Sequence, residues 1–298
     1  MRIMNDEECR RISRQRLSTR REHVKTHTLV LSVYILDYCN LNCHACSRWC
    51  NISKHHRIYK YDDICKDMLK ILSRTHYTQY IEYNGGEPLL HPDIVGLAQF
   101  LGEASKKFNI PFTSISTNLK KLLKMPDEFF KAVREGGIQI VYSIYPNVDI
   151  DYKECFKRLD DEHISYKNFT EIDKQPADAK RDDFIRTQFV LPPKHDTFAG
   201  FLSFTKCMGI CPNVWLGNIY KCCNLAFIQT VNDNYNTDIH ATGDDFMPVD
   251  DYTEDKYFEW LTKPSNFCKD YCHRTNIFKE DWHVGKTTKE ELILYKND

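Results

Sequence analysis

The chain has 298 residues, a formal charge of −1 at pH 7, 42% hydrophobic residues and 28% charged residues. This near-neutral balance gives no global electrostatic preference for nucleic acid or for a membrane surface. No apolar run approaches the roughly 20 residues that a membrane-spanning helix needs, and the N-terminus lacks the apolar core of a signal peptide. The composition therefore predicts a cytoplasmic globular protein with one large core or two smaller ones, and no membrane partner.

Residues 1–28 carry seven arginines among the first 21 positions, with few apolar residues between them. This segment is predicted to be an arginine-rich arm rather than a core element. A solvated helix or frayed terminus fits it, and so does a docking surface for an acidic partner or polyanion. Apart from this arm, the sequence gives no signal for nucleic-acid binding.

Strands and helices are predicted to alternate from Leu29 to about residue 170. The apolar, β-branched run at 29–36 is typical of a strand buried on both faces. Further strands are expected at 80–83, 112–116, 138–144 and near Ile164, separated by helices at 61–73, 94–108, 127–135 and from about Tyr152. Such repeated units predict a parallel α/β sheet, which places ligands at the C-terminal ends of its strands. The alternation stops after about Lys194, so a domain boundary is predicted near residue 195.

The chain contains 13 cysteines, many for a cytoplasmic protein. Because cytoplasmic thiols stay reduced, and because an odd number does not resemble a secreted disulfide framework, metal ligation is the leading interpretation.

Three of these cysteines, Cys39, Cys43 and Cys46, follow the first predicted strand with spacings of three and then two residues. A loop this short can wrap three thiolates around one [4Fe–4S] cluster and leave the fourth iron open. Zinc is the alternative, because Cys50 lies close enough to supply a fourth ligand. Cys50 is otherwise a buried spectator or a substrate-pocket residue, and His44 is expected to be a loop or supporting residue rather than a ligand.

The second predicted strand ends in the turn Gly85-Gly86-Glu87-Pro88. Glycines let a backbone approach a ligand closely, and a carboxylate complements an ammonium group. Polar side chains also follow the next two strands, although such residues are ordinary in turns as well: Ser116, Asn118 and Ser143.

The cysteine spacing and the Gly-Gly-Glu-Pro turn, each at a strand end, resemble the signature of the radical S-adenosylmethionine superfamily. The resemblance covers the order of elements from Leu29 to about residue 170. It implies a partial (β/α)6 parallel barrel at 29–195, in which the open iron binds S-adenosylmethionine. One-electron reduction then cleaves this cofactor to a 5′-deoxyadenosyl radical, which abstracts hydrogen from a substrate. A flavodoxin- or ferredoxin-type protein is the implied reductant.

The resemblance also implies a set of cofactor contacts. The turn would hold the methionyl amino group, and the polar residues after the next strands would contact the ribose and carboxylate: Gly85, Gly86, Glu87 and Pro88, then Ser116, Asn118 and Ser143. The residue before the third cysteine is usually aromatic in this family and contacts the adenine. Here it is Ala45, whose contact would come from the backbone instead of a ring.

A second group of cysteines follows the predicted domain boundary: Cys207, Cys211, Cys222, Cys223, Cys268 and Cys272. The spacing of Cys207, Gly217 and Cys222 resembles the opening of SPASM and twitch domains, in which a hairpin presents thiolates to an auxiliary [4Fe–4S] cluster. The resemblance implies a small α+β domain of the twitch type at 196–298, with a second cluster on Cys207, Cys222, Cys268 and Cys272. Cys211 or Cys223 can replace one ligand, and structural zinc on the same thiolates is the alternative.

The stretches 141–146 and 217–222 look like a subgroup of these enzymes from surface-polysaccharide and other sugar pathways. This likeness implies oxidation, epimerisation or rearrangement of a polar small molecule, with a sugar or nucleotide-linked sugar as the leading candidate. A peptide maturase is the second candidate, a nucleic-acid base-modifying radical enzyme the third, and a non-catalytic iron–sulfur or zinc protein the fourth. The sequence identifies no general acid or base.

Overall fold

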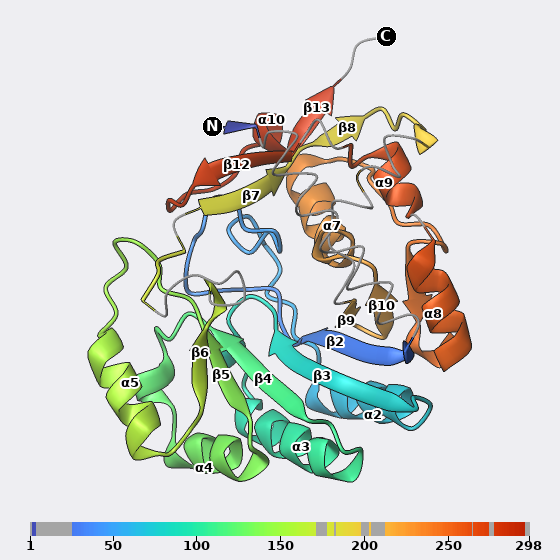
Figure 1. The fold of residues 1–298 in the computed structure, drawn as a ribbon. Helices are drawn as coiled ribbons and strands as arrows, with labels where there is room; N and C mark the ends of the chain where they lie inside the picture. Colours follow the sequence, from blue (N-terminus) through green and yellow to red (C-terminus); the bar gives the residue numbers. More distant parts are fainter. Residues whose placement is uncertain are drawn as a thin grey trace.

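The computed structural model describes residues 2–3, 26–170, 178–181, 183–197, 203, 212–263, 265–273 and 277–295. Its centre is an eight-stranded sheet with the strand order β11-β10-β9-β2-β3-β4-β5-β6 (Figure 1). Five of these strands pair in parallel in chain order: β2 (Thr28–Tyr34), β3 (Tyr77–Asn84), β4 (Phe112–Thr117), β5 (Gln139–Tyr142) and β6 (Tyr166–Asn168). The mostly parallel sheet predicted from the sequence is thus confirmed.

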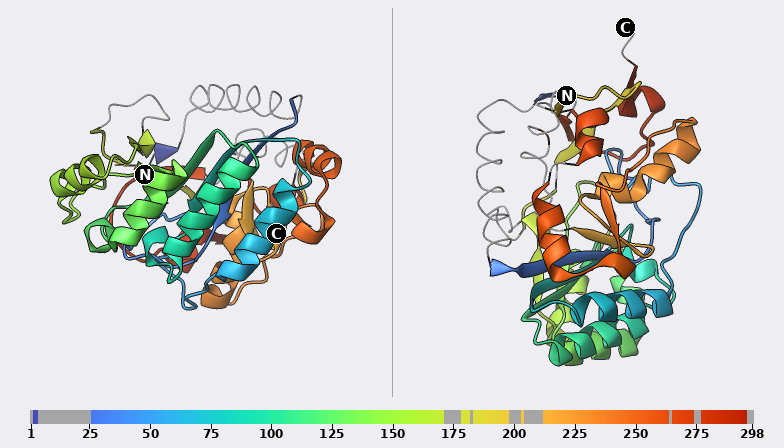
Figure 2. Two further views of the ribbon diagram at one scale, coloured as in Figure 1. Left: turned by 90° about the horizontal axis from the view of Figure 1, so that it is seen from below. Right: turned by 90° about the vertical axis from the view of Figure 1, so that its right-hand side faces the viewer.

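Helices connect these strands and cover the outer face of the sheet, as the left view of Figure 2 shows for the cyan-to-green helices. They are α2 (Tyr61–Leu72), α3 (Ile94–Lys107), α4 (Asp127–Gly136) and α5 (Tyr152–Asp161), with the short 3-10 turns η1 (Pro88–Leu90) and η2 (Leu122–Lys124). Each helix begins at the residue predicted from the sequence. No helix in the described part of the chain combines the length and the apolar character needed to cross a membrane.

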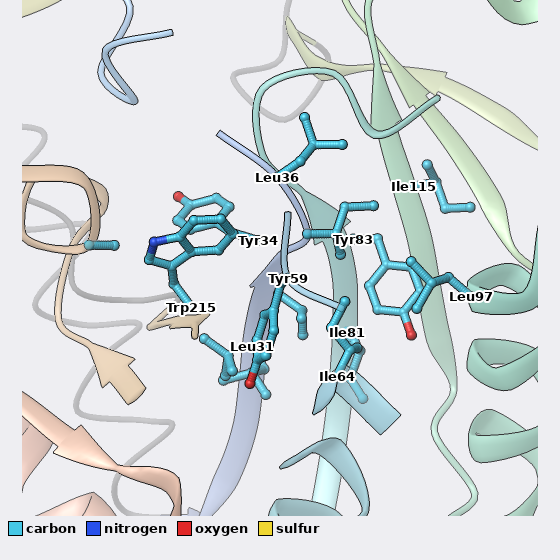
Figure 3. Packing of buried hydrophobic residues seen from close by; sticks show 14 of the residues in the cluster. Leu31, Tyr34, Leu36, Tyr59, Ile64, Ile81, Tyr83, Leu97, Ile115 and Trp215 are labelled. Carbon is cyan, nitrogen blue, oxygen red and sulfur yellow. The ribbon is translucent and has the colours of Figure 1, made fainter. Parts of the chain in front are cut away.

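Alternation along the strands separates an apolar face from a polar one, because successive side chains of a strand point to opposite faces. Leu31 and Ile81 are fully buried and pack with Ile64 of α2 and Leu97 of α3 (Figure 3). The residues that follow them, Ser32 and Glu82, lie on the other face. There Ser32 Oγ donates to Glu82 Oε2 at 3.4 Å, and Ser116 Oγ donates to the same carboxylate. The face turned away from the helices is therefore polar.

A sixth parallel strand comes from the C-terminal third of the chain. This strand, β9 (Asn213–Trp215), pairs with β2, and β10 (Asn218–Tyr220) and β11 (Phe246–Pro248) extend the same edge in antiparallel fashion. In the sheet, β9 therefore lies next to β2 and does not follow β6. The division into a six-unit partial barrel at 29–195 and an auxiliary domain at 196–298 stays a prediction.

Two small sheets form a second layer beyond the loops at the C-terminal ends of β3 and β4 (Figure 1). An antiparallel sheet contains β1 (Arg2–Ile3), β12 (Ile277–Asp281) and β7 (Asp183–Thr187), and β8 (Phe189–Leu191) pairs in parallel with β13 (Ile293–Tyr295). The other helical segments are α7 (Cys223–Tyr235), η4 (Val249–Asp251), α8 (Glu254–Thr262), α9 (Asn266–Asp270) and α10 (Lys289–Leu292). Of these, η4 packs on α2, and α8 lies beside the start of β2 (Figure 1). Two residues of the predicted arm belong to β1, whereas residues 4–25 lie outside the described part of the chain.

Candidate functional site

One cavity at the C-terminal ends of the parallel strands brings together residues from motifs that are far apart in sequence. Its lining includes Cys39, Cys43, Cys46, Gly85, Gly86, Glu87, Ser116, Asn118 and Ser143. Two other residues predicted to contact the cofactor, Ala45 and Pro88, do not line it; Ala45 is buried in the cysteine loop and Pro88 is the first residue of η1. The strand-end location expected from a parallel sheet agrees with this cavity.

The loop that carries the three cysteines is closed at its base by Asp37 and Arg57. The Asp37 N–H donates to Arg57 O at 3.1 Å, and the Arg57 N–H donates to Asp37 Oδ1 at 2.8 Å. Arg57 Nε also donates to Asp37 Oδ2 at 2.6 Å, and its guanidinium reaches Thr230 Oγ1 of α7 at 2.6 Å. Burial raises the pKa of Asp37, and the Arg57 charge and hydrogen bonds oppose that shift. The fully buried carboxylate therefore depends on Arg57 as its partner.

The Gly85-Gly86 pair packs against the backbone that leads into the cysteine loop. The Gly86 N–H donates to Leu36 O at 3.0 Å, and the Glu87 N–H donates to Tyr38 O at 3.0 Å. A Cβ atom on Gly86 would lie 1.8 Å from Tyr38 O, and one on Gly85 would lie 2.6 Å from Leu36 O. The two glycines permit the close approach of another backbone segment of the same chain. Their predicted contact is with a ligand.

Glu87 is buried, and its carboxylate is bonded within the chain. Thr117 Oγ1 donates to Glu87 Oε1 at 2.7 Å, and the Asn118 N–H donates to Oε2 at 2.8 Å. The Leu89 N–H adds a bond of 3.1 Å to Oε1. Burial raises the pKa of Glu87 to about 7, opposed by the donors from Asn118 and Thr117. The carboxylate thus fixes the end of β4 against the Gly-Gly-Glu-Pro turn. This structural role differs from the predicted contact between Glu87 and an ammonium group.

The three thiols have different surroundings. Cys39 Sγ accepts hydrogen bonds from the Leu41 N–H at 3.3 Å and from Asn118 Nδ2 at 3.6 Å. Burial raises the pKa of Cys39, and it raises that of Cys43 to about 11. A hydrogen bond with Cys50 lowers the pKa of Cys46, so Cys50 is a direct neighbour of one predicted ligand.

The three thiols of Cys39, Cys43 and Cys46 line one cavity. Across the described residues, no group of three or more His, Cys, Asp or Glu side chains is arranged to hold one metal ion. Three soft thiol donors lining one cavity suit a wider cluster. At Cys43 the Arg181 charge opposes the rise in pKa that burial causes, and at Cys46 the Arg48 charge adds to the lowering of the pKa by the hydrogen bond with Cys50.

His44 joins the cysteine loop to the second layer of the fold. Its Nδ1 lies 2.7 Å from Glu280 Oε1, and its Nε2 lies 3.1 Å from Glu291 Oε2. Its backbone N–H donates to His283 O at 2.9 Å, and the Gly285 N–H donates to Asn42 O at 2.8 Å. Because a carboxylate faces each ring nitrogen, the imidazole supports the loop and has no nitrogen left for a metal.

Sequence reasoning did not single out Arg48, Tyr145 and Arg181, which also line the cavity. Arg48 lies only two residues after Cys46, so its place in the cysteine loop was a usable signal. Arg181 follows no motif, and its position depends on a backbone bond from its N–H to Ile144 O at 2.7 Å. Burial raises the pKa of Tyr145 to about 12, which keeps this phenol neutral.

The second cysteine group is only partly described. Cys207 and Cys211 lie outside the described residues. Cys222 precedes the first residue of α7, Cys268 lies within α9, and Cys272 follows α9. Cys268 and Cys272 are both buried. Among the described cysteines of this group, Cys222, Cys268 and Cys272 do not line the cavity described above, and a second cluster stays a prediction.

No family model matches the chain. A curated 7,8-dihydro-6-hydroxymethylpterin dimethyltransferase from Methanocaldococcus jannaschii is 26% identical over 123 residues, which are 40% of this chain. The match spans only 22% of the length of that relative.

Several solved structures share part of the arrangement. BtrN in complex with AdoMet and 2-DOIA has a TM-score of 0.43 and 15% identity, covering 81% of this chain and 91% of that chain. Native anSMEcpe with bound AdoMet and Cp18Cys peptide has a TM-score of 0.36 and 16% identity, covering 46% and 41%. SuiB from Streptococcus suis bound to S-adenosylmethionine has a TM-score of 0.35 and 18% identity, covering 52% and 36%. At these values the likenesses do not assign the chain to a family.

Replacing Arg57 by Met should lower the free energy of unfolding by about 3 kcal/mol, because it leaves the Asp37 carboxylate buried without its partner. Urea denaturation of the metal-free protein measures this loss. Arg134→Met is the matched control, since Arg134 pairs with the half-buried Glu162 at the surface and should cost less than about 0.5 kcal/mol. Equal losses in the two variants would contradict the role of Arg57 at the loop base.

Gly86→Ala should lower the free energy of unfolding by more than about 2 kcal/mol, because the new methyl group overlaps the Tyr38 carbonyl. Thermal and urea unfolding measure the effect. Gly243→Ala serves as the control, because a Cβ there meets nothing within 4 Å. A Gly86→Ala protein as stable as Gly243→Ala would show that the two backbone segments do not pack this closely.

Proposed function

We propose that this chain is a radical S-adenosylmethionine enzyme. Its first cluster would be held by Cys39, Cys43 and Cys46, and the cofactor would bind beside that cluster, in contact with Gly85, Gly86, Ser116, Asn118 and Ser143. The observation that carries the proposal is the meeting of these residues, predicted from separate motifs, in one cavity at the strand ends.

A reduced cluster held by these thiolates would supply the one electron needed for reductive cleavage of S-adenosylmethionine, and the cofactor would supply the hydrogen-abstracting chemistry. The chain binds and orients these groups. The N–H groups of Leu41 and Asn118 donate to the Cys39 sulfur. Since the Glu87 carboxylate is bonded internally, the backbone oxygens of Gly85 and Gly86 are the acceptors that this turn offers to an ammonium group.

The proposed substrate is a polar small molecule, a sugar or a nucleotide-linked sugar, and the proposed outcome is oxidation, epimerisation or rearrangement. The polar lining of the cavity supports this choice, since Asn84, Ser116 and Ser143 lie where an apolar substrate would need apolar side chains. Arg48, Tyr145 and Arg181 add further hydrogen-bonding groups to the cavity wall.

The proposal extends to a second [4Fe–4S] cluster in a twitch-like C-terminal domain, on Cys207, Cys222, Cys268 and Cys272. The burial of Cys268 and Cys272 supports it, because both thiols lie inside the protein, where low solvent exposure would tune the reduction potential of a cluster. A flavodoxin- or ferredoxin-type reductant and a cytoplasmic location complete the proposed function.

Anaerobic reconstitution, followed by iron analysis and an assay with S-adenosylmethionine and dithionite, tests the first cluster. Cys43→Ala should reduce 5′-deoxyadenosine formation to background, because the cluster loses one of three ligands. Cys65→Ala is the control, since Cys65 lies in α2 and does not line the cavity. A fully loaded wild-type protein that forms no 5′-deoxyadenosine would refute the proposed function.

Iron content separates one cluster from two, with about four irons per chain expected for one cluster and about eight for both. Cys268→Ala should lower the content from about eight to about four and spare 5′-deoxyadenosine formation. Cys155→Ala, which replaces a cysteine that is buried elsewhere against Leu119, should keep all eight. Four irons in the wild type, unchanged in Cys268→Ala, would remove the second cluster from the proposal.

A further inference from the structure

We propose that the substrate is anionic and that the guanidinium groups of Arg48 and Arg181 bind its phosphate or carboxylate group. This inference rests on the proposed function, because it names the substrate class of the same cavity. It separates phosphorylated or carboxylated substrates, such as nucleotide-linked sugars, from neutral ones.

The charges that line the cavity are unbalanced. Arg48 and Arg181 are its two cationic side chains, and Glu87 is its one carboxylate, among the lining residues that the structure describes. The Glu87 oxygens already accept from Thr117, Asn118 and Leu89. Neither arginine forms an ion pair with Glu87 or with any other described carboxylate. Apart from the cysteine thiols, the lining side chains therefore carry more positive than negative charge, which favours an oxyanion at the two guanidinium groups.

Arg181 is held in place by aromatic rings instead of by a counter-ion. Its guanidinium carbon lies 4.6 Å from the ring centroid of Phe169 and 4.8 Å from that of Phe184, and both rings line the cavity. Its backbone is fixed by the bond from its N–H to Ile144 O. The side chain makes no hydrogen bond to the described residues, so its N–H donors stay available to a ligand.

Arg48 lies in the cysteine loop, which lines the same cavity. Its guanidinium carbon lies 5.3 Å from the ring centroid of Tyr34, at the end of β2. Its Nε atom is buried and has no hydrogen-bond partner within the described part of the chain. A buried donor without a partner is costly, and an oxyanion that accepts from the guanidinium would remove that cost.

The two arginines have one competing use, which is to balance the charge of the thiolates of Cys43 and Cys46. A point charge is enough for that purpose, and it does not require N–H donors to be left open toward the cavity. The predicted cofactor residues come from the ends of β3, β4 and β5, with Ala45 added from the cysteine loop. Arg48 and Arg181 are not members of this predicted set, and Arg181 comes after β6, which contributes no residue to it.

Isothermal titration of pyrophosphate into the anaerobically reconstituted protein tests the proposal without requiring turnover. Arg48→Gln and Arg181→Gln should each raise the dissociation constant at least about tenfold, since each removes a charge-assisted contact. Arg181→Lys keeps the charge and should recover part of the loss. Arg134→Gln, at the surface on α4, should leave the constant unchanged and serves as the matched control for non-specific charge effects.

The dissociation constant of S-adenosylmethionine, measured on the same samples, distinguishes the source of the oxyanion. Variants that weaken pyrophosphate binding and keep cofactor binding and iron content support the proposal. Variants that weaken S-adenosylmethionine binding and not pyrophosphate binding would assign the arginines to the cofactor carboxylate and overturn it. Variants that have a lower iron content and an unchanged affinity for pyrophosphate would assign the arginines to charge balance at the thiolates, which also overturns the proposal.

Formation of 5′-deoxyadenosine by the wild type without substrate is the separate test of the proposed function. If pyrophosphate binding depends on both arginines but no 5′-deoxyadenosine forms, the oxyanion site stands and the proposed radical reaction is refuted. If 5′-deoxyadenosine forms but neither substitution changes the affinity for pyrophosphate, the radical reaction stands and the oxyanion site is refuted.

Discussion

The candidate site depends on the close packing of two backbone segments, 36–38 and 85–87. Because Gly86 has no side chain, its N–H reaches Leu36 O and the next N–H reaches Tyr38 O. Glu87 then bonds the end of β4, and Asn118 from that end bonds Cys39 in the loop that began at Tyr38. These contacts link the ends of β2, β3 and β4 to one another. Displacing any one segment would disturb the other two.

Much of the central sheet followed from the sequence, because its signals are local. The four helices begin at the predicted residues since apolar side chains recur at helical spacing. At the start of α5, the Asp151 side chain also caps the helix by accepting from the Glu154 N–H. Parallel pairing then dictates that the residues after each strand meet at one edge. The cysteine loop, the Gly-Gly-Glu-Pro turn and the polar residues after β4 and β5 were predictable for that reason.

The rest depends on pairings between distant segments, which spacing does not encode. β3 begins at Tyr77, earlier than predicted, because its pairing with β2 extends through the polar Thr78. Nothing in the sequence near Asp37 marks Arg57 as its partner. Similarly, β9 joins β2 across about 180 positions of chain through only two paired residues. Neighbouring cysteines such as Cys222 and Cys223 likewise cannot be ranked as ligands by spacing.

The contacts of His44 have a consequence for the order of assembly. Its carboxylate partner Glu280 lies 236 positions further along the chain, whereas Asp37 and Arg57 are 20 positions apart. During synthesis the base of the cysteine loop can therefore close long before its far side is covered. The far side is covered only after Glu280 and Glu291 have been made, because these carboxylates hold the two ring nitrogens of His44. The cysteine loop is therefore tethered at its base, and still open on its far side, until most of the chain has been synthesised.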